Sequence, residues 1–156
     1  MSDDACPPFH LERKNMSVPV SERSEGKFSL AIKAESLARY TIEITSNENV
    51  FLPVYRERLT NEIVMHALEA YMEIRDANDT IVHVGSKDQH HEWMERRRHQ
   101  ELALMHCRRL LWLIDIAHRV FHLSGKRVKY WGEMTINVRN RVQAWMQNDA
   151  ERYSEK

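Results

Sequence analysis

Residues 89–123 read QHHEWMERRRHQELALMHCRRLLWLIDIAHRVFHL, and this stretch decides the fold class. Alternating steps of four and three residues place a series of its side chains on one helical face. At 1.5 Å per residue the predicted helix is about 50 Å long. The N-terminal half of this seam is polar, so we expect that half to project or to meet a polar partner. The predicted seam positions are Trp93, Arg97, Gln100, Leu104, Cys107, Leu111, Ile114, His118 and Phe121.

Three further segments carry amphipathic helical patterns, over residues 28–46, 53–78 and 125–150. Pro53 suits a first helical turn, where its missing N–H has no intrahelical partner. Residues 79–88 break the pattern and predict the longest internal loop. The predicted inward positions are Leu30, Ala34, Leu37, Thr41 and Ile44 in the first segment, Leu59, Ile63, His66 or Ala67, Ala70, Ile74 and Ala77 in the second, and Val128, Trp131, Thr135, Val138, Val142, Trp145 and Asp149 in the third.

Composition agrees with a single helical domain. The chain has 156 residues, of which 42% are hydrophobic and 29% charged, but only four are glycine and four proline. So few turn residues disfavour a β-sandwich or barrel. We therefore predict an all-α fold, an antiparallel up-and-down four-helix bundle over residues 28–152. Residues 1–27 hold three of the four prolines and no sustained periodicity, which predicts a flexible, disordered N-terminal arm.

The sequence predicts a cytoplasmic protein. No apolar run approaches the roughly 18 residues of a membrane span, and the first 25 residues lack the apolar stretch of a signal peptide. The two cysteines, Cys6 and Cys107, are too few and too far apart for a disulfide framework, and we expect both to be reduced.

The net charge of zero conceals a local asymmetry. Residues 1–50 hold six basic and eight acidic side chains, residues 51–90 four and seven, and residues 91–156 thirteen and eight. Within residues 96–141 there are eleven basic side chains against three acidic ones. Such an excess suggests a polyanion partner, although a solvated helix face accounts for it equally well.

No motif for catalysis or cofactor binding occurs. The chain lacks the glycine-rich phosphate loops, the nucleophile elbow and the zinc-protease helix motif, so we predict no catalytic residue and no cofactor. His99 and His106 share a helix face, as do His118 and His122, but a di-iron bundle needs Glu-x-x-His pairs and none occurs. We therefore predict no metal site. Cys107 lies among aliphatic residues and is expected to be a small buried hydrophobe.

Two features leave alternatives open. Trp93 stands beside Arg96, Arg97 and Arg98, where its ring either fills the core or stacks on a nucleobase or guanidinium group. The arginines of residues 96–141 suit RNA phosphates and equally suit carboxylates of a neighbouring subunit.

Four segments together resemble the prokaryotic four-helix-bundle family that contains the accessory variability determinant (Avd) proteins of diversity-generating retroelements and the intervening-sequence proteins of 23S ribosomal RNA. The segments are KAESLARY (33–40), YRERLTNE (55–62) with its Ala77-Asn78 ending, RRHQELAL (97–104), and Tyr130-Trp131 leading to Ala144-Trp145. The resemblance spans about residues 30–152.

This resemblance implies a non-enzymatic, barrel-shaped homopentamer. In the Avd branch the family binds the reverse transcriptase of the element and its template RNA or RNA/cDNA, and supports mutagenic cDNA synthesis. The alternative is an oligomeric protein-binding bundle of the intervening-sequence type with no nucleic-acid role. The positions onto which the resemblance carries the basic RNA-binding surface of the family are Arg56, Arg58, Arg97, Arg98, Arg127 and Lys129.

Overall fold

The computed structural model describes the backbone of residues 22–154 and the side chains of residues 29–154, and this part of the chain contains four long α-helices and no β-strand. A 3₁₀ turn, η1 (Pro53–Tyr55), and a π-helical turn, η2 (Arg56–Thr60), lead into the second long helix. The predicted all-α fold is confirmed. The four helices are α1 (Glu22–Thr45), α2 (Asn61–Asp79), α3 (Gln89–Val120) and α4 (Gly125–Tyr153).

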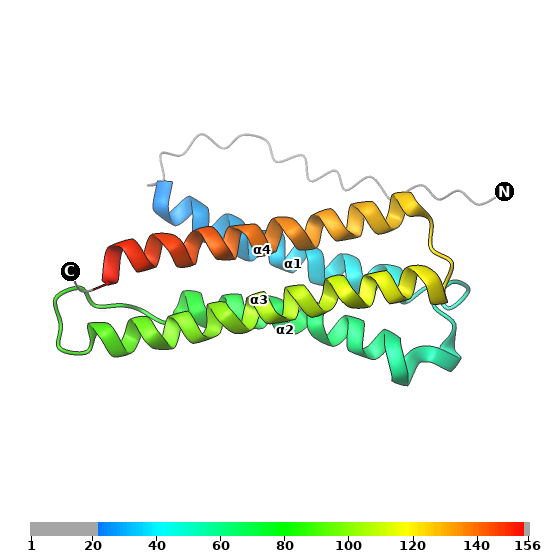
Figure 1. Ribbon diagram of the computed structural model, residues 1–156, viewed down its shortest axis with the longest axis horizontal. Helices are drawn as coiled ribbons and strands as arrows, with labels where there is room; N and C mark the ends of the chain where they lie inside the picture. Colours follow the sequence, from blue (N-terminus) through cyan, green and yellow to red (C-terminus); the bar gives the residue numbers. More distant parts are fainter. Residues whose placement is uncertain (1–21, 155–156) are drawn as a thin grey trace.

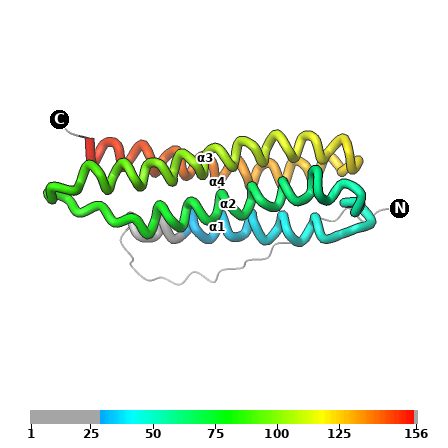
Figure 2. The backbone as a smooth tube through the Cα atoms, turned by 90° about the horizontal axis from the view of Figure 1, so that it is seen from below, coloured from blue at the N-terminus to red at the C-terminus, as the bar shows by residue number. Residues whose placement is uncertain are grey.

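The four helices lie alongside one another, and consecutive helices run in opposite directions (Figure 1). Each helix packs against the next one along the chain, and α4 closes against α1. The view turned by 90° places α3 and α4 on one side of the molecule and α1 and α2 on the other (Figure 2). Short connections favour this arrangement, since each returns the chain next to the helix that it has just left.

The helix boundaries differ from the predicted ones at the starts of α1 and α2. The predicted helix over residues 53–78 begins with η1 and η2 and becomes an α-helix only at Asn61. Helix α1 begins at Glu22, six residues before the predicted start at Phe28, so residues 22–27 belong to a helix and not to the predicted arm. The rest of that arm, residues 1–21, lies outside the described residues. Residues 80–88 form a loop between α2 and α3, as expected.

The inward faces of α1, α2 and α4 are confirmed. Every predicted inward residue of α1 and of the segment that ends with α2 is buried, including both His66 and Ala67. In α4 the same holds from Trp131 to Asp149, while Val128 is half-buried. A hydrogen bond within this core joins α4 to α1. The indole N–H of Trp131 donates to the hydroxyl of Thr41 at 3.0 Å. That hydroxyl donates in turn to the carbonyl of Leu37 at 2.8 Å.

The predicted seam of α3 is wrong at every second position. The five positions spaced by seven residues, from Trp93 to Phe121, are buried as predicted. The intervening positions are shifted by one residue toward the N-terminus, so the buried seam alternates steps of three and four where the predicted one alternates steps of four and three. At one of them the small Ala103 faces the core where the apolar pattern favoured Leu104. The buried residues at these positions are Arg96, Ala103, Leu110 and Ala117, in place of Arg97, Leu104, Leu111 and His118.

Candidate nucleic-acid interface

One end of the bundle collects cationic side chains from three segments. Turn η2, the end of α3 and the start of α4 all lie at this end (Figure 1). The rings of Tyr55 and Phe121, whose centroids are 5.7 Å apart, connect η1 to the end of α3. We call this group of cations the basic end. Its members are Arg56, Arg58, Arg119, Lys126, Arg127 and Lys129.

Two members of the basic end have acidic partners. Arg56 Nη2 lies 2.6 Å from Glu48 Oε1, and Lys129 Nζ lies 4.0 Å from Glu133 Oε1, in exposed pairs that contribute little to stability. Among residues 22–154, no ion pair involves the other four members. Ser124 caps α4 by accepting the backbone N–H of Arg127 at 3.2 Å. The partial positive charge of this helix N-terminus adds to that of the four cations without acidic partners.

The other two predicted binding residues, Arg97 and Arg98, do not join this group. They lie in the N-terminal third of α3, toward the opposite end of the bundle (Figure 1). Arg97 Nε donates to Glu101 Oε1 at 3.1 Å, one helical turn away. The six predicted residues therefore form two groups, four at the basic end and two near the start of α3. Sequence reasoning left Arg119 and Lys126 out of the site, although Lys126 directly precedes Arg127 in the chain. Arg119 joins this group only through the fold, at the end of α3.

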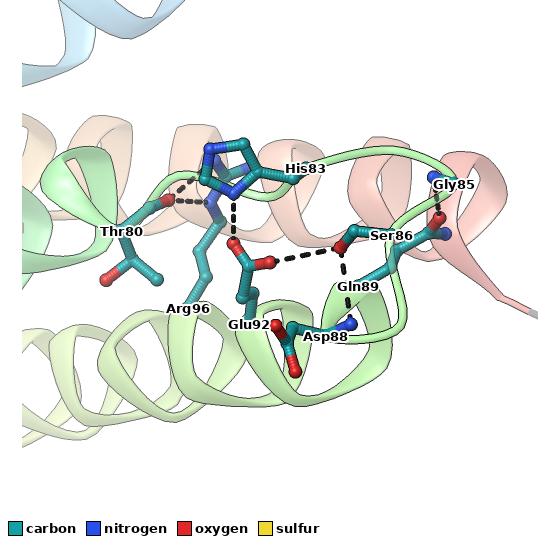
Figure 3. Close-up of polar contacts among 8 residues, drawn as sticks. All are labelled: Thr80, His83, Gly85, Ser86, Asp88, Gln89, Glu92 and Arg96. Atoms are coloured by element: carbon teal, nitrogen blue, oxygen red, sulfur yellow. Dashed lines mark hydrogen bonds and ion pairs between the residues drawn. The ribbon is translucent and has the colours of Figure 1, made fainter.

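Arg96, although it belongs to the same basic run, is not part of any surface. Its side chain is only 4% exposed, and its guanidinium lies 3.4 Å from the carboxylate of Asp149, which is 3% exposed. It also donates to the carbonyl of Thr80 from Nε at 3.0 Å and from Nη2 at 2.7 Å (Figure 3). Gln100 Nε2 donates to Asp149 at 3.1 Å. The polar half of the α3 seam thus meets its polar partner inside the chain, on α4.

The loop before α3 is fastened to the first turns of that helix (Figure 3). His83 Nδ1 lies 2.7 Å from Glu92 Oε2, and the backbone N–H of Gly85, a residue with φ of 82°, donates to Gln89 Oε1 at 2.7 Å. The hydrogen bond from His83 holds the pKa of the Glu92 carboxyl below its ordinary value. These contacts fix the chain where Thr80 supplies its carbonyl to the buried guanidinium.

The structure places two tryptophans of α3 in different environments. Trp93 is 7% exposed and packs with Val82 and Tyr153, so the stacking role considered for it is wrong and the core role is right. Trp112, which the sequence analysis did not single out, is 58% exposed, and the guanidinium of Arg108 lies 5.6 Å from its ring centroid. The helical position of Trp112 indicates its exposure, since it lies opposite the buried face of α3.

The contact between α2 and α3 brings histidines and carboxylates together. His66 Nδ1 and His106 Nδ1 are 2.9 Å apart, and burial lowers the pKa of both imidazoles. Nearer the start of α3, His99 Nδ1 lies 2.6 Å from Glu73 Oε2, beside Asp76. These last three residues are the only group of metal-ligand type found within residues 22–154.

Cys107 is a buried free thiol in the centre of α3. Burial raises its pKa to about 12, so the thiol is protonated and unreactive in the folded protein. The predicted identity of Cys107 as a small buried hydrophobe is confirmed.

Comparisons with known proteins add no relative: no family model, no curated protein and no solved structure matches this chain. None of the helices in residues 22–154 is both long enough and apolar enough to cross a membrane.

Proposed function

We propose that this protein is a non-enzymatic accessory protein of a diversity-generating retroelement. In this proposal it assembles as a homopentameric helical bundle in the cytoplasm and binds the reverse transcriptase together with its template RNA or RNA/cDNA. The observation that carries the proposal is the basic end, where Arg58, Arg119, Lys126 and Arg127 have no acidic partner within residues 22–154. The family resemblance of residues 30–152 supports it.

The basic end suits recognition by phosphate contact and shape. Its arginines present planar donor groups that match phosphate oxygens, and its members come from three segments that a folded RNA contacts together. Contacts of this kind fix position on a nucleic acid and carry little base specificity. The role is therefore that of a scaffold, which holds the template RNA against the polymerase.

The test compares two pairs of charge reversals on a labelled RNA hairpin, followed by fluorescence anisotropy over a salt series. Arg58→Glu with Arg127→Glu alters the basic end, whereas Arg97→Glu with Arg98→Glu alters the start of α3. We expect the first pair to weaken binding by at least about tenfold. It should also reduce the slope of log affinity against log salt concentration by about one for each phosphate contact that is lost. We expect a smaller loss from the second pair. RNA binding that is absent, or insensitive to salt, would contradict the proposal.

A second candidate is a protein-binding oligomer with no nucleic-acid role. Exposed apolar side chains on the outer faces of α2 and α3 favour it, since such groups mark interfaces. They are Met65, Leu68, Met72, Trp112 and Ile116. Light-scattering mass at low and high salt, with absorbance at 260 and 280 nm, separates the two candidates. A salt-stable pentamer that retains RNA only at low salt supports the first candidate, and an oligomer free of nucleic acid supports the second.

A further inference from the structure

We propose that Glu73 and Asp76 of α2 and His99 of α3 form a binding site for a divalent transition-metal ion of the zinc type, which clamps the two helices together. This site lies outside the basic end, and the inference does not depend on the proposed function. It departs from the sequence-based expectation of no metal site, which considered histidines on one helix and Glu-x-x-His pairs but not ligands that α2 and α3 bring together.

The fold places three ligand side chains around one point. Glu73 and Asp76 are three residues apart, so they lie on the same face of α2. Helix α3 runs antiparallel beside that face and supplies His99. One ligand atom from each residue lies within 4.8 Å of the other two. The Glu73 and His99 side chains are 16% and 14% exposed, so the site is largely shielded but open to solvent on the Asp76 side.

The donor set selects the class of ion. One imidazole nitrogen and two carboxylate oxygens suit zinc and its neighbours in the transition series, which bind such atoms at about 2.0–2.2 Å. Magnesium and calcium prefer oxygen donors throughout. A divalent ion balances the charge of the two carboxylates beside a neutral imidazole, and three protein ligands leave one position of a tetrahedral site for water.

Asp76 distinguishes a metal site from a simple histidine–carboxylate pair. The hydrogen bond between His99 and Glu73 is complete without a metal. The Asp76 carboxylate, by contrast, takes part in no hydrogen bond or ion pair among residues 22–154, and only its backbone carbonyl is used, by Thr80. A bound ion gives this carboxylate a partner. Replacing the Asp76 carboxylate therefore weakens metal binding and leaves the hydrogen bond between His99 and Glu73 in place.

A pair of histidines, one heptad along the same helices, provides the matched control. His66 and His106 face each other through Nδ1 atoms 2.9 Å apart, but no carboxylate completes a three-ligand group with them in residues 22–154. The substitution His106→Gln thus removes an imidazole from the same helix and a similar setting without touching the proposed site.

The experiment is calorimetric titration of Zn²⁺ into the full chain, freed of any affinity tag and treated with EDTA. We expect one equivalent of zinc per chain, with affinity reduced at least about tenfold by Asp76→Asn and more by His99→Gln, and unchanged by His106→Gln. Magnesium should not compete. Circular dichroism of each variant verifies that the helices remain folded.

A thermal readout tests the clamp itself. At zinc concentrations about 100 times Kd, mass action predicts a rise in Tm of about 5 °C or more, which Asp76→Asn should remove at the same zinc concentration. Absence of stoichiometric zinc binding would overturn the proposal. So would binding that survives His99→Gln and disappears with His106→Gln, because the ion would then occupy the other histidine pair.

Discussion

The two ends of the bundle use arginine in opposite ways. At the basic end, Arg58 and Arg127 are accessible to solvent and have no acidic partner among residues 22–154. At the other end, Arg96 is buried against Asp149 and Thr80. Charge counted along the sequence treats these arginines alike. The fold assigns one kind to the surface for which RNA binding is proposed and the other to the attachment of α3 to α4.

The run Arg96–Arg98 shows how this difference arises within three residues. Successive residues on an α-helix are rotated by about 100°. Arg96 therefore points into the bundle, Arg97 lies at the flank beside Glu101, and Arg98 is exposed. A basic run on a helix reaches several environments, and only one of its members contributes to any one surface.

The largest effect should follow from removing Asp149. The variant Asp149→Ala leaves the guanidinium of Arg96 buried without its carboxylate, and we expect the free energy of unfolding to fall by about 3–5 kcal/mol. Urea unfolding followed by circular dichroism measures the change. Arg97→Ala is the matched control, since it removes an exposed pair on the same helix. A loss below about 1 kcal/mol for Asp149→Ala would show that the buried pair is not what joins the helices at this end.

Between the two ends, the His66–His106 pair should make stability depend on pH. Burial lowers the pKa of both imidazoles from the ordinary value of 6.5, so the folded protein keeps them neutral where the unfolded chain takes up protons. The free energy of unfolding should therefore decrease as pH falls below about 7, through 6.5 and toward the lowered folded-state pKa values. Urea unfolding at pH 7.5, 6.5 and 5.5 in the presence of EDTA measures this dependence.

The charged groups around the pair have opposing effects. Glu62 and Glu69 raise the pKa of His66, while Arg109 lowers the pKa of both histidines. His106→Gln should flatten the pH dependence, and His90→Gln, which alters an exposed histidine of the same helix, should leave it intact. An unchanged dependence in His106→Gln would assign the effect to other groups.

A smaller and more local effect is expected at the loop before α3. Glu92→Gln removes the carboxylate that accepts from His83, and we expect only a small decrease in the free energy of unfolding. Because the loop also carries Thr80, hydrogen exchange of residues 80–88 should accelerate while the centre of α3 stays protected. Equal acceleration along the whole helix would mean that loop and helix open together.

The smallest effects should come from the exposed cations. Arg58→Ala and Lys129→Ala should each change stability by less than about 0.5 kcal/mol, because neither side chain is buried. Thermal unfolding of each variant beside its RNA affinity tests this. A large decrease in the free energy of unfolding for either variant would contradict the difference between the exposed cations of the basic end and the buried Arg96 at the other end.

Sequence reasoning predicted the fold from helical periodicity and succeeded where the pattern had a single solution. The stripe of α1 from Leu30 to Ile44 is an example. It failed in α3, where Leu104 outweighs Ala103 in any hydrophobic pattern although the alanine is the buried residue, and where Leu110 and Leu111 are equally apolar. The six basic positions carried over from the family resemblance fall into two groups in the fold, because distance along the chain gives no information on which end of a bundle a residue occupies.

The rate at which Cys107 reacts with a thiol reagent can report how often the bundle opens. The thiol is fully buried, and its raised pKa of about 12 keeps it protonated while the bundle is intact. In a Cys6→Ser background, a disulfide reagent therefore modifies the chain only during excursions in which α3 separates from its neighbours. With reagent limiting, the labelling rate gives the equilibrium population of the opened form, and with reagent in excess it gives the opening rate. The protein thus carries a native reporter of rare conformations at its centre.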